Sequence, residues 1–409
     1  MATVKPFKCL MPARGRFEEV AALPYDVYNR AEAAQVVKGK PYSFLNIDRP
    51  ETQFDADHDM YADDVYAKAA SMLSDWEKQG VLTEDQDASF YIYELTMDGR
   101  VQTGIVGCSA VDDYLDGTVR KHELTLAKKE KDRIRHVDTC SAQTGPIFLA
   151  YRSRADIKAV IAEAKKSAPL FDFVSEDGIR HAGWKVLGEL NDKLEKAFAD
   201  TPRTYIADGH HRAASAVKVA LKRREENPGY TGAEEFNFFL SVLFADDELM
   251  ILPYNRLIKD LGGLSVSEFM DKVSVSFNIT PKSGIVEPSV KGTFGMYVDE
   301  KWYELGVKPE LVKNDPVGSL DVSYLQENFL TAILGISDPK NDPRIDFAGG
   351  IRGTQYLVDR CHEDCVLAVS MYPTSIGELL AVADAEKLMP PKSTWFEPKL
   401  RSGLFMHKF

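Results

Sequence analysis

The sequence predicts an α+β or α/β protein with a mixed β-sheet at its core. Ser89–Ala110 alternates large residues around Asp98-Gly99, which is the strongest short signal for a hairpin turn. Thr204–Ala207 has the apolar character of a short strand, and a helical pattern of apolar residues follows it directly. A strongly apolar run at 236–244 adds a short buried strand.

The N-terminal part combines an irregular segment with one clear helix. Residues 1–57 mix proline, glycine and charged residues, with a short helical stretch at 30–38. At 58–80 the apolar residues recur with helical spacing, and Gly80 ends the pattern. We interpret this apolar stripe as core.

The remaining elements suggest two domains. Two helical stretches, 155–166 and 182–199, flank a strand at 169–174. Leu261-Gly-Gly-Leu264 is a plausible hinge, so we predict a first domain over 1–264 and a second α+β lobe over 265–409. The second lobe is expected to contain a helix at 266–277, a hairpin at 295–306, a helix at 322–334, a loop at 335–355, a strand at 365–371 and a helix at 375–388.

Composition limits the classes of function. The chain has 409 residues, of which 44% are hydrophobic and 28% charged, as in ordinary globular proteins. A net charge of −13 disfavours non-specific binding to nucleic acid or anionic membranes. The N-terminus lacks a signal-peptide pattern, and five scattered cysteines suit a reducing compartment, so we expect a cytoplasmic protein. The oligomeric state is left open.

Asp208-Gly-His-His-Arg212 carries the main functional signal, because it lies where the predicted strand ends and a helix begins. Unpaired backbone N–H groups and the helix dipole favour anions at such a place. Gly209 allows close approach of the backbone to a ligand, and Arg212 can grip two phosphate oxygens. His210 and His211 add groups that titrate near neutral pH.

A second charged segment, at 117–136, has two interpretations. Its run Lys128–Arg135 is by default the solvated face of a helix. The alternative is a second half-site, in which Lys129 and Arg133 reach the phosphates and Glu123 supplies an acid. We expect no metal-ligand cluster here, because a zinc-protease motif beginning at His122 would need a second histidine where Leu126 stands.

Several stretches together resemble a known bacterial family. Asp208–Arg212 resembles the phosphate-binding box of the ParB/sulfiredoxin superfamily, which includes free-serine kinases. The longer matches narrow the resemblance to the domain-of-unknown-function family 1015, and they are Ala22–Val27, His122–Leu126, Lys131–Arg133, Tyr205–Arg212 and Met389–Leu400.

The resemblance implies a ParB/sulfiredoxin-like phosphate site and phosphoryl transfer between ATP or ADP and a small hydroxy amino acid, with serine or phosphoserine as the natural substrate. Such chemistry usually uses Mg²⁺. Glu123 is the expected base, with Asp208 next, and His210 and His211 complete the catalytic set. The implied phosphate or nucleotide ligands are Gly209, Arg212, His122, Thr125, Lys129, Arg133, and Lys392, Ser393 and Thr394 from a C-terminal segment, 389–400, that folds back over the site.

Two other functions compete with phosphoryl transfer. Sulfiredoxin-like chemistry needs a cysteine in the box, where this chain has His210. A ParB-like DNA clamp conflicts with the net negative charge. A non-catalytic nucleotide or metabolite sensor is the form of the binding hypothesis that remains. In either case we expect small-molecule ligands, no nucleic acid and no membrane.

Overall fold

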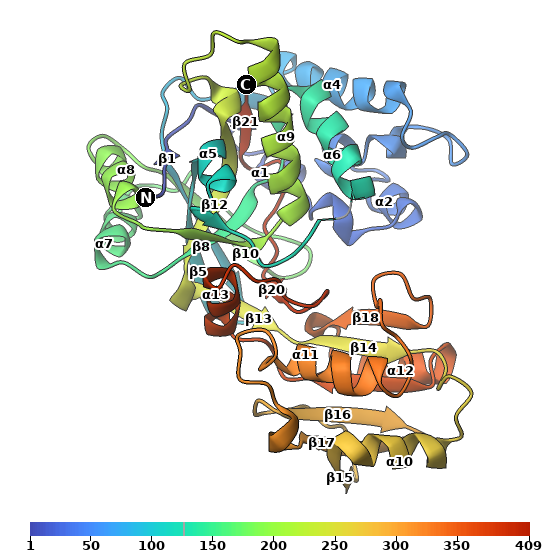
Figure 1. Cartoon of the computed structure of the whole chain (residues 1–409). Helices are drawn as coiled ribbons and strands as arrows, with labels where there is room; N and C mark the ends of the chain where they lie inside the picture. Colours follow the sequence, from blue (N-terminus) through green and yellow to red (C-terminus); the bar gives the residue numbers. More distant parts are fainter. Residues whose placement is uncertain (126) are drawn as a thin grey trace. The chain divides into compact units, whose positions relative to one another are not determined.

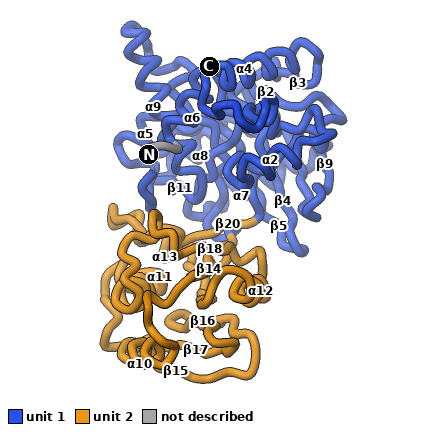
Figure 2. The backbone as a smooth tube through the Cα atoms, turned by 90° about the vertical axis from the view of Figure 1, so that its right-hand side faces the viewer, with its two compact units in different colours: residues 1–249, 398–409 blue, residues 250–397 orange. Residues whose placement is uncertain are grey.

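The structure is a computed structural model that describes residues 1–125 and 127–409, without the side chains of Ala127, Lys128 and Lys129. Two compact units make up the chain (Figure 2). Unit 1 contains Met1–Leu249 and Pro398–Phe409, and unit 2 contains Met250–Glu397. The compact units therefore divide at 249/250 and again at 397/398, whereas the sequence suggested a single boundary at 264/265.

Unit 1 is built on a mixed sheet of nine described strands (Figure 1). Their order is β6-β11-β8-β12-β5-β4-β10-β9, with β1 paired to β5. β11 is parallel to β6 and antiparallel to β8, whereas β12 is parallel to β8 and antiparallel to β5. The predicted mixed sheet is thus confirmed. The strands are β1 (Val4–Lys5), β4 (Tyr91–Met97), β5 (Arg100–Ala110), β6 (Val119–Arg120), β8 (Ile147–Tyr151), β9 (Phe171–Val174), β10 (Arg180–Lys185), β11 (Thr204–Asp208) and β12 (Phe238–Ala245).

The predicted hairpin forms β4 and β5. Asp98 and Gly99 both have positive φ, 51° and 78°, as a tight hairpin turn requires. The predicted helix at 182–199 is wrong at its start, because residues 180–185 form β10 and pair with β4. Burial in the sheet decides the structure of this segment, and the helix begins only at Leu190.

Helices cover the sheet of unit 1, and a smaller antiparallel sheet, β3-β2-β21-β7, joins the N-terminal and C-terminal segments. The expected helix at 58–80 is α4 (Asp63–Lys78), whose buried stripe ends at Trp76. α6 (Ala127–Cys140) lies beside α9 (His210–Glu226), where Lys222 pairs with Asp138. The other elements are α1 (Phe17–Val20), α2 (Arg30–Val36), α3 (Leu45–Asp48), α5 (Val111–Leu115), α7 (Ala155–Ala164), α8 (Leu190–Ala199), β2 (Cys9–Pro12), β3 (Leu82–Glu84), β7 (Ala142–Gln143) and β21 (Met406–Lys408).

Unit 2 is the predicted second α+β lobe. Its six-stranded antiparallel sheet has the order β15-β17-β16-β19-β14-β18. The predicted loop at 335–355 is wrong in part, because its residues 345–349 form β18 and pair with β14. The elements are β13 (Met250–Leu252), β14 (Tyr254–Ile258), β15 (Phe277–Lys282), β16 (Thr293–Val298), β17 (Lys301–Val307), β18 (Ile345–Gly349), β19 (Leu367–Met371), β20 (Trp395–Glu397), α10 (Val266–Ser276), α11 (Asp321–Leu325), a π-helix (Gln326–Thr331), α12 (Gln355–Glu363) and α13 (Ile376–Asp384).

None of the helices in the described part of the chain combines the length and apolar content that a membrane span requires.

Candidate functional site

The strand–turn–helix that the sequence predicted is formed by β11, Gly209 and α9. Gly209 has φ 90° and ψ 30°, a left-handed conformation that glycine adopts without strain. It occupies the N-cap position and provides no side chain to bond the first N–H groups of α9. These N–H groups and the dipole of the 17-residue helix therefore create a positive electrostatic potential at this turn.

Asp208 is held at the turn by cations. Its Oδ1 accepts a hydrogen bond from the Gly209 N–H at 2.8 Å, and its Oδ2 lies 3.3 Å from Lys399 Nζ and 3.9 Å from Arg212 Nη2. Burial alone would raise the pKa of the Asp208 carboxyl, but Lys399 and Arg212 outweigh it and bring that pKa well below its usual range. Asp208 is therefore ionised, paired and a weak base.

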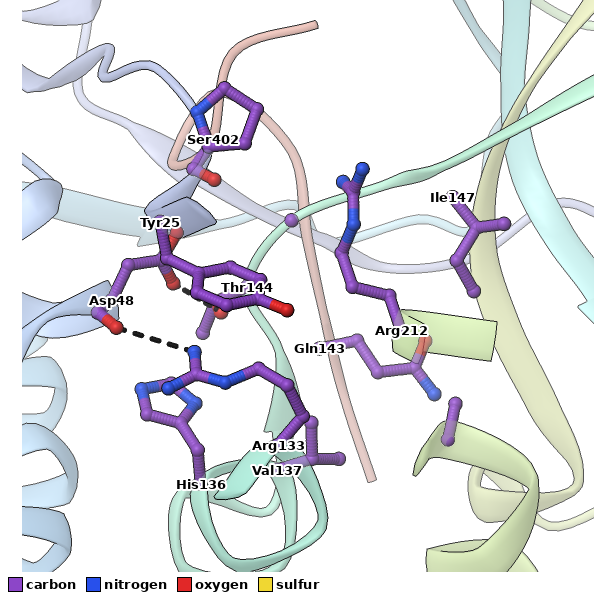
Figure 3. A pocket seen from close by; sticks show the side chains of 13 residues that line it. Tyr25, Asp48, Arg133, His136, Val137, Gln143, Thr144, Ile147, Arg212 and Ser402 are labelled. Atoms are coloured by element: carbon purple, nitrogen blue, oxygen red, sulfur yellow. Dashed lines mark hydrogen bonds between the residues drawn. The ribbon is translucent and has the colours of Figure 1, made fainter. Parts of the chain in front are cut away.

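Arg212 points from the first turn of α9 into a small cavity of about 30 Å³ (Figure 3). Its Nη1 donates to the Pro146 carbonyl. A Cβ on Gly209 would lie 3.0 Å from Arg212 Nε, so the glycine also makes room for the guanidinium. The cavity is lined by Tyr25, Asp48, Arg133, His136, Thr144 and Ser402 among others.

Arg133 reaches the same cavity from α6. Figure 3 shows its guanidinium under the Tyr25 ring, whose centroid is 4.1 Å away, with Arg212 on another side of the cavity. Arg133 Nη2 pairs with Asp132 Oδ2 at 2.9 Å, and its Nη1 donates to the Asp48 carbonyl at 3.2 Å. Burial raises the pKa of the Tyr25 phenol although both arginines oppose it, so Tyr25 keeps its proton and can donate.

A larger pocket adjoins this cavity and shares Tyr25 and Arg133 with it. Its volume of about 330 Å³ lies within the range of small-molecule sites. The lining combines aromatic and apolar side chains with both signs of charge, from Asp26, Tyr28, Arg49, Pro50, Glu51, Met60, Tyr61, Val65, Tyr66 and Asp132. The two spaces together present guanidinium groups and tyrosine rings to a ligand.

His122 and His210 form a buried pair beside the turn. They are 2% and 7% exposed, their ring centroids are 4.5 Å apart, and their planes are nearly perpendicular. Burial lowers the pKa of His122 to about 4, although a hydrogen bond to the Ile206 backbone opposes this. Burial and His122 lower the pKa of His210 well below its usual value. Both rings are therefore neutral near pH 7, and the expectation that His210 titrates there is wrong.

Each ring of this pair has one nitrogen without a partner among the described residues, His122 Nδ1 and His210 Nε2. The Ile206 bond raises the His122 pKa, as a bond donated to a carbonyl does, so Nδ1 carries the lone pair in the neutral ring. His122 consequently presents an acceptor, which suits a hydroxyl or an amine better than a phosphate oxygen.

The expected second half-site is partly buried. Glu130 and Arg133 are each 6% exposed, so the solvated-face interpretation is wrong for these two residues. Glu130 accepts a hydrogen bond from Thr125 Oγ1 and pairs with Lys218. The Thr125 hydroxyl is therefore already used in a hydrogen bond within the protein. Glu123 is half-buried, and His211 lies in the first turn of α9. The side chain of Lys129 lies outside the described residues.

The C-terminal segment contributes a residue that the sequence did not single out. Lys399, in unit 1, contacts Asp208. Lys392, Ser393 and Thr394 belong to unit 2. There Lys392 Nζ lies 5.2 Å from the centroid of the Tyr254 ring, and Ser393 Oγ donates to the Pro390 carbonyl at 2.6 Å.

The cavity also contains residues that sequence reasoning missed. Tyr25 lies inside the Ala22–Val27 stretch, which was a usable signal. Asp48, His136, Thr144 and Ser402 carry no local motif, and only the fold brings them together.

The described residues form no cluster of three or more His, Cys, Asp or Glu side chains that would hold a metal ion. Mg²⁺ is often held by one or two carboxylates together with substrate phosphates, so Asp208 or Glu123 could share one with a bound nucleotide. Mg²⁺ stays a prediction.

Several solved structures are similar to the chain at low identity. A conserved hypothetical protein from Pyrococcus furiosus has 13% identity and a TM-score of 0.38, over 75% of this chain and 95% of that one. A free serine kinase in complex with AMP has 12% identity and a TM-score of 0.36, over 74% and 91%. SbnI from Staphylococcus aureus, with a C-terminal truncation, has 10% identity and a TM-score of 0.38, over 74% and 87%.

No curated protein matches the sequence. The model of one protein family matches residues 4–323, which is most of the chain. The chain belongs to the family described as "Protein of unknown function (DUF1015)".

Proposed function

We propose that the protein transfers a phosphoryl group between ATP or ADP and a small hydroxy amino acid, with serine or phosphoserine as the substrate. The observation that carries this proposal is the convergence of Arg212 and Arg133 on one cavity at the N-terminus of α9. Phosphoryl transfer requires mainly that donors hold the charged oxygens in place while a hydroxyl attacks. Two guanidinium groups and a phenol supply such donors at the positive end of the α9 dipole.

The adjoining pocket gives the organic part of a ligand a place. Its tyrosine rings offer surface for a nucleoside or for the carbon skeleton of an amino acid. Arg49 Nε pairs with Glu51 Oε1 at 2.6 Å, and Asp132 pairs with Arg133, so the ammonium and carboxylate of an amino acid would bind beside charges that already have partners. A zwitterionic substrate with a phosphoryl group at one end matches this distribution of charge.

The reaction needs a group that takes the hydroxyl proton while the substrate oxygen bonds to phosphorus and the bond to the leaving oxygen of ADP breaks. Asp208 is poorly suited, because its ion pairs lower its basicity. Glu123 is our candidate, and the lone pair of His122 Nδ1 is a second acceptor that can orient the hydroxyl. In the reverse direction the same groups return the proton.

Binding is tested by thermal shift of the full chain with ATP, ADP, CTP, serine and phosphoserine. A ligand at 100 times its Kd stabilises the folded state by about 2.7 kcal/mol, which is readily measured. Transfer is then followed from ATP to serine and from phosphoserine to ADP, with phosphoserine hydrolysis measured in parallel. Turnover in any of the three reactions supports the proposal. Binding of nucleotide without any turnover would instead identify a sensor, and a chain that binds none of the five compounds refutes both.

A further inference from the structure

Unit 2 contains a buried arginine in β14, the second strand from one edge of its sheet. Arg256 lies in β14, between β18 and β19, where it is opposite Phe347 and Val369. It is 3% exposed. A guanidinium carries its charge at every ordinary pH, and a buried charge is strongly unfavourable unless it is paired. The surroundings of Arg256 therefore require an explanation.

The described residues give Arg256 no carboxylate partner. Its Nη1 donates to the Tyr254 carbonyl, and its guanidinium carbon lies 5.1 Å from the centroid of the Phe347 ring. Its Nε is buried without any acceptor among the described residues. The cation–π contact is weaker than the cost of burying an unpaired charge. Nε lies on the edge of the guanidinium that binds oxyanions through two parallel hydrogen bonds, and none of the described residues provides an acceptor for it.

We propose that Arg256 is the core of a second anion site, in unit 2, which binds a phosphate or carboxylate group on the Nε–Nη2 edge of its guanidinium. Lys392 supports this assignment, since its Nζ lies 5.2 Å from the centroid of the Tyr254 ring. Tyr254 in turn contacts Phe347, with 5.9 Å between centroids. Arg256 and Lys392 thus each lie over one ring of this touching pair, so both cations belong to the same cluster of side chains. This site is independent of the proposed phosphoryl transfer.

The test uses the full chain with the Arg212→Met substitution as the parent, so that the cavity of unit 1 binds as little phosphate as possible. The melting temperature is measured in phosphate, acetate and chloride at equal ionic strength. Arg256→Met keeps the length of the side chain and removes its charge. We expect phosphate to raise the melting temperature of the parent by roughly 5 °C at saturating concentration. The Arg256→Met variant should not respond, and in chloride it should be at least as stable as the parent, because an unpaired buried charge is gone.

A purely structural arginine gives the opposite pattern. Arg256→Met would then lower the melting temperature equally in all three salts, and the proposal would be wrong. An unchanged phosphate response in Arg256→Met would also overturn it. If that variant does not fold, Arg256→Lys decides, because a point charge cannot replace the fork; a full phosphate response in Arg256→Lys contradicts the proposal. Equal responses to acetate and phosphate identify a carboxylate-bearing ligand, and a response to phosphate alone identifies a phosphate.

Discussion

His122 and His210 meet edge to face, with 4.5 Å between ring centroids and an angle of 89° between planes. The folded state keeps both rings neutral, because burial lowers their pKa values. An unfolded chain has no such constraint, and its histidines take up protons below pH 6.5 or so. The contact therefore links the stability of unit 1 to pH.

The first prediction concerns this linkage. Between pH 6.5 and about 4 the unfolded chain binds a proton at His122 that the folded chain does not, so stability falls as the pH falls. The shift corresponds to about 3 kcal/mol lost between pH 7 and pH 4. His122→Gln keeps a donor for the Ile206 carbonyl and should flatten the pH dependence in urea unfolding. The exposed His362→Gln serves as the control, and equal slopes in both variants would contradict the assignment.

Arg212→Lys should keep the fold and weaken the binding of a phosphorylated ligand by about ten-fold, because an ammonium cannot replace two parallel hydrogen bonds. Isothermal titration calorimetry with the ligand that stabilises the wild type measures the effect. Arg223→Lys, on the same helix but paired with Asp138, is the matched control. An unchanged Kd for Arg212→Lys would remove Arg212 from the site.

Glu123→Gln preserves shape and removes basicity. We expect turnover to fall by roughly 10²–10⁴-fold, the usual contribution of a general base, while the Kd for nucleotide changes only a few-fold. Single-turnover transfer between ATP and serine measures the step, with the exposed Glu225→Gln as control. Wild-type turnover in Glu123→Gln would place the base elsewhere, and Asp208→Asn would be measured next.

Gly209→Ala should lower both the stability of the fold and the affinity for a phosphorylated ligand. A side chain at φ 90° is strained, which costs about 1 kcal/mol of stability. The added Cβ also lies 3.0 Å from Arg212 Nε and must displace the guanidinium. Unfolding in urea and phosphate-ligand binding should both be impaired. Gly178→Ala, also at positive φ but with open space around it, should lose stability alone. Wild-type binding in Gly209→Ala would show that Arg212 tolerates the shift.

Lys399→Met leaves the Asp208 carboxylate without its nearest cation, at a turn where an anion is expected to bind. We predict a loss of about 1 kcal/mol in ligand affinity, or roughly five-fold in Kd. Adding Asp208→Asn to Lys399→Met should restore most of the affinity, since it removes the repulsion between the Asp208 carboxylate and the bound anion. Lys408→Met, in the same segment but paired with Glu77, is the control. A double variant as weak as Lys399→Met would mean that Lys399 contacts the ligand itself.

Local chemistry made the turn predictable, and long-range packing made the cavity unpredictable. The strand, Gly209 and the helix follow from apolar periodicity and from the properties of glycine within a short stretch. The cavity instead draws Tyr25, Asp48, Thr144 and Ser402 from separate segments, each ordinary in sequence. The burial of Glu130 was hidden for the same reason, because its partner Lys218 is far away along the chain.

The return of the C-terminal segment to unit 1 has a consequence for the order of assembly. Lys399 and Asp208 are 191 positions apart, and β21 must insert between β2 and β7 to complete the smaller sheet. After β11 and α9 have left the ribosome, the whole of unit 2 must still be synthesised before Lys399 can reach the turn. During that interval Asp208 lacks its main counter-charge, and the loop that must close contains a whole folding unit. The turn at Asp208 and Gly209 therefore reaches its final electrostatic state only late in synthesis.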